Sequence, residues 1–389
     1  MPIVNRIADF HAELTGWRRH IHQNPELGFE EFETAGFVAE RLTDMGLEIH
    51  RGLGGTGVVA TIKGNGGDGP AIGLRADMDA LPIQEKGTPE YRSKNDGKMH
   101  ACGHDGHTTM LLGAAKYLAE TRNFAGTVQL IFQPAEEGKG GGKKMVEDGL
   151  FKLFPVEEVY GMHNRPEMPV GSFGVSAGPV MAARDNWELF ISGRGAHAAM
   201  PHQGVDPVVV GANIVMALQT ITSRNIDPAE ALVISATQFH AGDAFNVIPD
   251  DIILRGTCRV LNPELQATLP ERIKRVADGI AATYGATAEL NYLSGYPATV
   301  NTEKEADFAA SVCAEISGGM GTVDRELPPS MGAEDFSYML QEKPGAYIWC
   351  GNGDTAGLHH PEYDFNDEAL TVGASYWSKL VETRLAKSA

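Results

Sequence analysis

The chain has 389 residues, of which 42% are hydrophobic, and 51 acidic against 32 basic residues give it a formal net charge of -19. Single hydrophobic cores rarely grow to this length, so we expect two domains. The acidic balance argues against nucleic acid or an anionic membrane surface as a partner, because both require basic patches. The chain has no leader-like start, no membrane-length apolar run and no CxxC cysteine pair. We therefore expect a cytoplasmic protein.

The first half of the chain predicts alternating helices and strands. Apolar residues at three- and four-residue spacing predict a helix from Ile7 to Ile21 and another over about 29–45, which ends at Gly46. Further strands are expected over 58–63, 71–76, 127–132 and 159–162, with a helix over 108–120. This alternation indicates an α/β layer domain.

From about Arg184 the pattern changes to the ferredoxin-like order β-α-β-β-α-β. The expected elements are strand 186–192, helix 207–221, strands 231–240 and 251–260, helix 263–284 and strand 286–292. Helix 303–316, strand 346–349 and a closing helix from Asp367 follow. Because ligand-type residues lie on both sides of the ferredoxin-like segment, we expect an insertion. The prediction is a discontinuous α/β/α catalytic domain over residues 1–183 and 296–389, with an inserted domain over 184–295.

Metal-ligand residue types are concentrated in the segment 99–107, which contains one cysteine and three histidines. Cys102 and His104 are two residues apart, so an extended or looped backbone would point both side chains the same way. Taken alone, this spacing is more typical of a histidine-rich turn with a buried cysteine than of a metal site. Further ligand types follow predicted strands elsewhere, and they favour a metal site: Asp79, Glu136, Glu137, His163 and, in a later loop, His359 or His360.

The candidate ligands Cys102, His104, Glu137, His163 and His359 are too many for one tetrahedral ion. They suit two ions that share a bridging ligand and leave a position for water. A mixed set of nitrogen, oxygen and sulfur ligands favours zinc or a neighbouring transition metal over magnesium or calcium. We therefore expect two divalent ions per subunit, zinc first, with manganese, cobalt or nickel as alternatives.

The adjacent carboxylates of Glu136 and Glu137 suggest two different roles, one as a metal ligand and one as a general base. If one of the two carboxylates binds metal, its neighbour on the loop points elsewhere and is free to take a proton from the metal-bound water, which is general base catalysis. The alternative is a solvated acidic turn. Asp79 is expected to hydrogen-bond a ligating histidine, or else to cap a turn. His100, Asp105 and His107 are expected to support the ligands or to cap a helix, and His202 and His240 to lie on the surface.

Several motifs together resemble the M20 metallopeptidase family, over nearly the whole chain and in the expected order. Within it they resemble the amidohydrolase branch of hippurate hydrolases, N-acyl-amino-acid deacylases and auxin-conjugate hydrolases. The motifs are GLRADMDALP at 73–82, MHACGHDGH at 99–107, FQPAEE at 132–137, GMH at 161–163, GAHAAMPH at 195–202, NVIPD at 246–250 and LHHP at 358–361.

The resemblance implies a dinuclear site in which Cys102 bridges and Glu136 is the general base, with His104, Glu137, His163 and His359 as the other ligands. Where many M20 peptidases have a histidine ligand, this chain has Asp77, which is a feature of the amidohydrolase branch. His359 is preferred over His360 because the family pattern reads Leu-His-X-Pro.

The resemblance also implies that the inserted domain is a lid and a dimerisation domain, so that the protein is a homodimer or a larger homo-oligomer. His197 would stabilise the tetrahedral oxyanion, in its own subunit's site or in the partner's. Asn246 would hold a substrate carboxylate or carbonyl. Independently, the small residues around His197 suit the close approach of another backbone.

We therefore expect a metal-dependent amidohydrolase that cleaves N-acyl amino acids, of hippurate or N-acetyl type, into a carboxylic acid and a free amino acid. A dipeptidase or carboxypeptidase would use the same amide chemistry. A zinc-stabilised binding protein is the non-enzymatic alternative. The spare carboxylate of Glu136 and the presence of His197 argue against it, because a structural zinc site closes with four ligands and no base.

Overall fold

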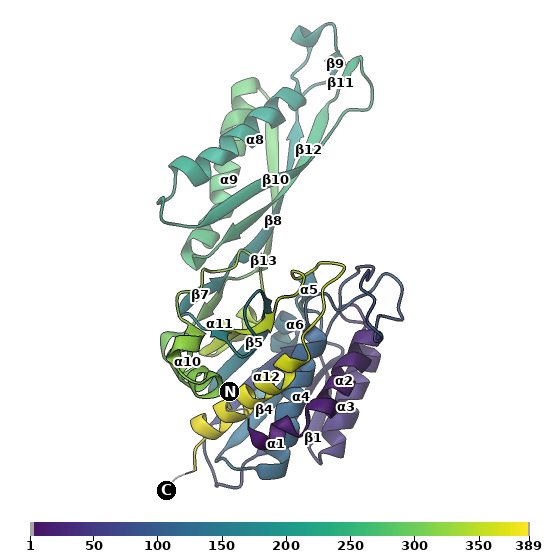
Figure 1. Cartoon of the computed structure of the whole chain (residues 1–389). Coiled ribbons are helices and arrows are strands. Elements are labelled where there is room, and N and C mark those ends of the chain that lie inside the picture. Colours follow the sequence, from purple (N-terminus) through teal and green to yellow (C-terminus); the bar gives the residue numbers. More distant parts are fainter. Residues whose placement is uncertain (1–3, 388–389) are drawn as a thin grey trace. The chain divides into compact units, whose positions relative to one another are not determined.

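The computed structural model describes residues 4–387, which fold into two compact units (Figure 1). The first unit comprises residues 4–178, Val300–Pro328 and 335–387, and the second comprises Pro179–Thr299 and Pro329–Glu334. A mixed eight-stranded sheet and a separate antiparallel sheet confirm the expected α/β class.

The sheet of the first unit has the strand order β1-β2-β4-β3-β5-β16-β6-β15. Strands β4, β3, β5 and β16 run parallel to one another, while the pairs β1–β2, β2–β4 and β6–β16 are antiparallel. Strands β3 and β4 are buried along almost their whole length, as expected for parallel strands covered on both faces. The strands are β1 (Glu48–Leu53), β2 (Gly57–Lys63), β3 (Ala71–Asp77), β4 (Thr127–Gln133), β5 (Glu158–Pro166), β6 (Phe173–Gly174), β15 (Val323–Asp324) and β16 (Gly345–Gly353).

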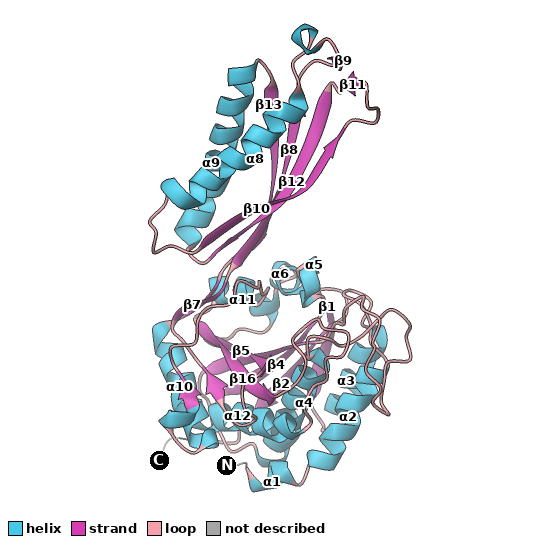
Figure 2. Ribbon diagram, turned by 45° about the horizontal axis from the view of Figure 1, so that its top comes forward, coloured by secondary structure: helices cyan, strands magenta, loops and turns pink. Residues whose placement is uncertain are grey.

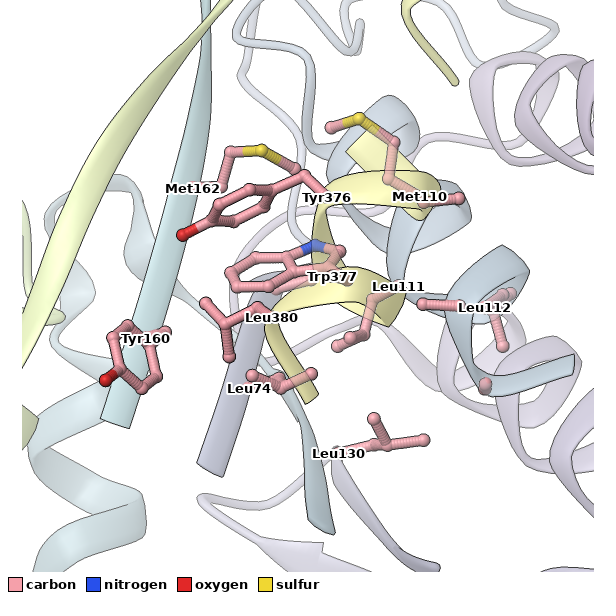
Figure 3. Close-up of a cluster of buried hydrophobic side chains, with 14 of the residues drawn as sticks. Leu74, Met110, Leu111, Leu112, Leu130, Tyr160, Met162, Tyr376, Trp377 and Leu380 are labelled. Carbon is pink, nitrogen blue, oxygen red and sulfur yellow. The ribbon is translucent and has the colours of Figure 1, made fainter. Parts of the chain in front are cut away.

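Helices cover both faces of this sheet, with α4 and α12 on one side and α6 and α11 on the other (Figure 2). Trp377 of α12 is buried beside Leu111 of α4 and above Leu74 of β3 (Figure 3). The apolar core therefore ties the last helix to the helix that begins with a candidate ligand. The helices are α1 (Asn5–Ala8), α2 (His11–Gln23), α3 (Phe32–Asp44), α4 (His104–Thr121), α5 (Glu136–Lys139), α6 (Gly141–Glu147), α7 (Leu150–Leu153), α10 (Glu303–Ser317), α11 (Ser337–Glu342) and α12 (Glu368–Arg384).

Three local expectations were wrong. The helix expected from Ile7 is interrupted between α1 and α2, and the helix expected from about residue 29 begins at Phe32 because Phe29 has a φ of 67°. Helix α4 begins at His104 rather than near residue 108; Gly103 precedes it with a φ of 93°. The first turn of α4 is polar yet buried, so it carries no apolar periodicity for a sequence pattern to detect.

The second unit contains a four-stranded antiparallel sheet of order β10-β12-β8-β13, with the element succession β8-α8-β10-β12-α9-β13. Each helix has a proline at its start, and the side chains of Asp206 and Asn262 cap α8 and α9 respectively. The elements are β8 (Ala183–Ser192), α8 (Pro207–Arg224), β10 (Leu232–Ala241), β12 (Asp251–Val260), α9 (Pro263–Tyr284) and β13 (Thr287–Tyr296). Two-stranded pairs join β7 (Gly178–Met181) to β14 (Thr299–Asn301) and β9 (Ala196–His197) to β11 (Val247–Ile248).

Among residues 4–387, no helix combines the length and the low polarity needed to cross a bilayer.

Candidate metal centre

The parallel strands of the first unit deliver ligand-type side chains at their carboxyl ends. Asp79 follows β3, Glu136 and Glu137 follow β4, and His163 lies within β5. The amino end of α4 adds His104. The carboxyl ends of parallel strands meet at one edge of a sheet, which is where open α/β sheets bind ligands.

The five predicted ligands lie together in two groups that share Cys102. Ligand atoms of Cys102, His104 and His163 lie within 4.8 Å of one another, and those of Cys102, Glu137 and His359 do the same. The Cys102 Sγ atom is 3.4 Å from Nε2 of His163, and Oε1 of Glu137 is 3.3 Å from Nε2 of His359. A shared thiolate between two groups is the arrangement expected for two bridged ions.

The ring nitrogens of two candidate ligands are oriented by acceptors on their far side. Nδ1 of His163 donates to the carbonyl of Asn164 at 2.7 Å, and Nδ1 of His104 lies 3.2 Å from Oδ1 of Asp79. Each contact leaves Nε2 facing the other candidate ligands: Nε2 of His163 lies 3.4 Å from Cys102 Sγ, and Nε2 of His104 lies 4.0 Å from Oε1 of Glu137. Metal-binding histidines are commonly fixed in this way, because an acceptor on one nitrogen sets the tautomer at the other.

Two buried atoms test whether the site fits a cation. Nε2 of His104 and Oε1 of Glu137 form no well-aligned hydrogen bond among the described residues, and their charged contacts are at 3.6 Å to Oδ2 of Asp77 and at 3.3 Å to Nε2 of His359. Buried polar atoms without partners are rare and cost about 1–3 kcal/mol each. A divalent cation would satisfy both atoms, so the residues present fit a metal centre.

The charges around the site favour protonated forms of two ligands. Burial raises the pKa of the Cys102 thiol well above its usual value, and Glu137 and Glu136 raise it further. Burial lowers the pKa of His104, but Asp77 and Asp79 outweigh that effect and raise it to about 10. Cation binding would replace these protons, so metal affinity should increase with pH.

The Asp79 side chain contacts three parts of the site. Besides its contact with His104, its Oδ1 accepts the backbone N–H of Glu136 at 3.0 Å and its Oδ2 accepts that of Glu137 at 2.9 Å. The sequence predicted the first contact. The contacts with the backbone N–H groups of Glu136 and Glu137 were not predicted, because residue type does not show where a backbone N–H group will donate.

The loop after β16 presents His359 rather than His360. His359 has a φ of 64°, which is uncommon for a residue with a side chain, and it points its Nε2 atom toward Glu137. His360 instead accepts the backbone N–H of Glu362 through its Nδ1 atom.

His107 is held by neighbours on both ring nitrogens. Nδ1 lies 2.6 Å from Oδ1 of Asp77, and Nε2 accepts the backbone N–H of Asn164 at 3.0 Å. Arg75 holds the other Asp77 oxygen at 2.7 Å. Burial raises the pKa of Asp77, but the cationic neighbours outweigh it and hold the pKa well below its usual value. His107 therefore supports the ligand loops, as expected.

A second buried ionic cluster lies behind the first turn of α4. Asp105 contacts Nδ1 of His22 at 2.8 Å and Nη1 of Arg18 at 3.5 Å, and His100 is buried nearby. Neither Arg18 nor His22 was among the residues predicted from the sequence. One signal was available: Arg18 lies one helical turn after Leu14 on the apolar face of its helix, where an arginine requires buried partners.

The two remaining predicted site residues belong to the second unit. His197 on β9 pairs with Val247 on β11, and the N–H of Ala198 donates to the carbonyl of Asn246. His197 and Asn246 are both exposed and lie close together on this short ribbon. Their roles stay predictions. His202 and His240 are exposed, as expected.

Comparison with known proteins gives consistent matches over almost the full chain. The family model described as peptidase family M20/M25/M40 matches residues 73–383. Hippurate hydrolase of Campylobacter jejuni is 42% identical over 98% of both chains. N-acetylcysteine deacetylase of Bacillus subtilis is 42% identical over 95% of this chain and 96% of its own. The crystal structure of the Bacillus subtilis YXEP protein, described as a dinuclear metal binding peptidase, is 38% identical and superimposes with a TM-score of 0.86 over 98% of this chain and 100% of its own.

Proposed function

This chain belongs to peptidase family M20/M25/M40, as a hydrolase of the amidohydrolase branch, and we propose that it cleaves N-acyl amino acids into a carboxylic acid and a free amino acid. The observation that carries the proposal is the shared position of Cys102 in two ligand groups, with the carboxylate of Glu136 beside them. Oxygen atoms of Glu136 and Glu137 and a nitrogen of His104 also lie within 4.8 Å of one another.

The residues divide the reaction between them. Cys102, His104, Glu137, His163 and His359 would hold two divalent ions, zinc first, which supply an acidified water and polarise the amide carbonyl. Glu136 takes a proton from the attacking water and returns it to the leaving amine. Asp79 keeps Glu136, Glu137 and His104 in fixed orientations through its three contacts. The expulsion of the amino acid product then needs no further acid.

The test is hydrolysis of N-benzoylglycine, N-acetyl amino acids and an unblocked dipeptide by chelator-treated protein, with zinc, manganese, cobalt or nickel restored separately. Glu136→Gln should lower kcat by about 10²–10⁴-fold and keep metal content unchanged. Glu147→Gln is the matched control, because Glu147 is exposed and pairs only loosely with Lys143. Full turnover by the Glu136→Gln variant would refute the assignment of the base.

A dipeptidase or carboxypeptidase is the second candidate, and the similarity to a structure described as a peptidase favours considering it. The same panel separates the two functions. Cleavage of blocked substrates alone supports the deacylase, whereas cleavage of the unblocked dipeptide alone supports the peptidase.

We further propose that the second unit is a ferredoxin-like lid and dimerisation domain. Strand β10 forms an edge of its sheet, and its Val233 and Phe239 side chains are 41% and 43% exposed. On the neighbouring helix α8, Met216 is 72% exposed. An unpaired, partly apolar edge is a natural surface for a second copy. Phe239→Glu should then shift the sedimentation coefficient from dimer to monomer.

His197 is proposed to stabilise the oxyanion and Asn246 to hold the substrate. His197→Ala should lower kcat by about 10²–10³-fold without loss of metal. Mixing His197→Ala subunits with Glu136→Gln subunits tests which site His197 serves. Recovered activity means that it serves the partner's site, and continued inactivity means that it serves its own.

A further inference from the structure

The turn that carries Glu136 and Glu137 has an irregular backbone. Ala135 lies in the left-handed region with φ 55° and ψ 42°, and Glu137 has φ -66° and ψ 73°. Gly138 and Gly140 also have positive φ values. Residues with a Cβ atom seldom adopt the left-handed conformation unless surrounding contacts impose it. The orientation of the two glutamates therefore depends on contacts from outside the turn.

Those contacts come from carboxylates that bind three successive backbone N–H groups. Ala135 donates to Oε1 of Glu31 at 2.8 Å, Glu136 donates to Oδ1 of Asp79 at 3.0 Å, and Glu137 donates to Oδ2 of Asp79 at 2.9 Å. A carboxylate is a stronger acceptor than a backbone carbonyl, since the bond is charge-assisted. The first part of the turn is thus held by acidic side chains from two distant segments.

Glu31 is itself held rigidly. Its side chain is completely buried, and its second oxygen accepts the hydroxyl of Thr56 at 2.6 Å. The segment before it lies directly against the turn: a Cβ atom on Gly28 would be 3.0 Å from Cα of Ala135, and Nζ of Lys139 donates to the carbonyl of Gly28 at 2.7 Å. The segment between α2 and α3 therefore packs directly against the turn and restricts its movement.

We propose that Glu31 is a positioning residue, which sets the Ala135–Glu136 peptide and so aims Glu136 at the attacking water and Glu137 at the metal. This inference rests on the proposed roles of those two glutamates. The side-chain oxygens of Glu31 accept hydrogen bonds from the Ala135 N–H and the Thr56 hydroxyl, so Glu31 reaches the two glutamates through the backbone of the turn. Small misplacements of a catalytic group are costly, about 10²-fold for roughly 1 Å.

The test compares Glu31→Ala, Glu31→Gln and Glu30→Ala. Glu31→Ala removes the acceptor and should lower kcat about 10–100-fold, with little change in KM. It should also weaken metal binding about 10–100-fold, because Glu137 loses its orientation. Glu31→Gln should keep most of the wild-type kcat and metal affinity, since the glutamine amide oxygen can accept the Ala135 N–H and its NH₂ group can donate to Thr56. The exposed side chain of Glu30 pairs with Lys98 at 3.3 Å and its other hydrogen bonds are made by its backbone, so Glu30→Ala should behave as wild type.

Metal affinity, measured by competition with a chromophoric chelator, reports on Glu137 whichever substrate is cleaved. If the wild-type protein cleaved none of the N-acyl amino acids, the proposed function would fail, and metal affinity alone would then decide the positioning proposal. Wild-type metal affinity in Glu31→Ala would overturn it. Equal impairment of Glu31→Gln and Glu31→Ala would also overturn it, because the hydrogen bond would not be the cause. Should Glu31→Ala not fold, Thr56→Val frees the Glu31 side chain, and it should produce a smaller loss of the same kind.

Discussion

Gly103→Ala is expected to weaken metal binding, because Gly103 lies between the candidate ligands Cys102 and His104. Its φ of 93° is left-handed, and a Cβ atom there would lie 2.1 Å from Nδ2 of Asn164. Asn164 would have to move. Its side-chain Nδ2 donates to the backbone carbonyl of Cys102 at 2.6 Å, and its backbone carbonyl accepts Nδ1 of His163 at 2.7 Å. Displacing it would therefore disturb two candidate ligands at once.

The magnitude follows from two separate costs. A left-handed residue with a side chain costs about 1–2 kcal/mol. Overpacking of a tightly filled site costs about 1–3 kcal/mol more. Gly97 offers a matched control, because its φ is 75° and a Cβ atom there would meet nothing within 4 Å. Gly97→Ala should lose only the cost of the left-handed conformation. Gly103→Ala should lose that cost and the cost of overpacking.

The assay combines urea-induced unfolding of the metal-free proteins with chelator competition for zinc. Gly103→Ala should bind zinc about 10–100-fold more weakly, as is typical when groups that orient metal ligands are lost. Gly97→Ala should bind zinc like the wild type. Equal stability and equal zinc affinity in the two variants would refute the argument that Asn164 has to move.

Three further outcomes are expected. Arg18→Met removes the buried guanidinium that contacts Asp367 at 2.8 Å and Asp105 at 3.5 Å, and it should cost about 3–5 kcal/mol of unfolding free energy. The half-exposed Arg19→Met should cost less than about 1 kcal/mol. Burial lowers the pKa of His22, but Asp105 and Glu85 outweigh it and raise it to about 9. The resulting stabilisation, on the order of 3 kcal/mol, should be complete below about pH 6.5 and be lost as the pH rises through about 9. His22→Gln should abolish that pH dependence in urea unfolding. Chelation should lower the melting temperature, and about 100 Kd of added zinc should restore about 2.7 kcal/mol of stability.

The elements that the sequence predicted well are those whose apolar pattern is strong. Strands β3 and β4 are nearly continuous apolar runs, and the helix Pro263–Tyr284 has a regular apolar face. Strand β1 escaped detection because its residues are mostly polar and exposed. Glu137 and His163 were predicted because they follow or end predicted strands, whereas Cys102 and His104 were predicted from the concentration of ligand residue types in the segment 99–107.

The rest of the site depends on tertiary contacts that no local pattern records. Glu31 lies 104 positions before Ala135, whose backbone N–H it binds. The polar residues 104–107 are buried where His107 contacts Asp77 and Asp105 contacts Arg18. Buried polar residues look like surface residues in a sequence. Their partners become visible only once the chain is folded.

The position of β16 between β5 and β6 has a consequence for synthesis on the ribosome. Strand β5 ends at residue 166, but its neighbour β16 begins about 180 residues later. At about 5–20 residues per second, the nascent chain carries an unpaired β5 edge for roughly 10–40 seconds. During that interval the second unit can complete its own sheet, and His359 has not yet been made. An open edge of this kind recruits other strands, so the emerging chain should depend on chaperones until β16 has left the exit tunnel.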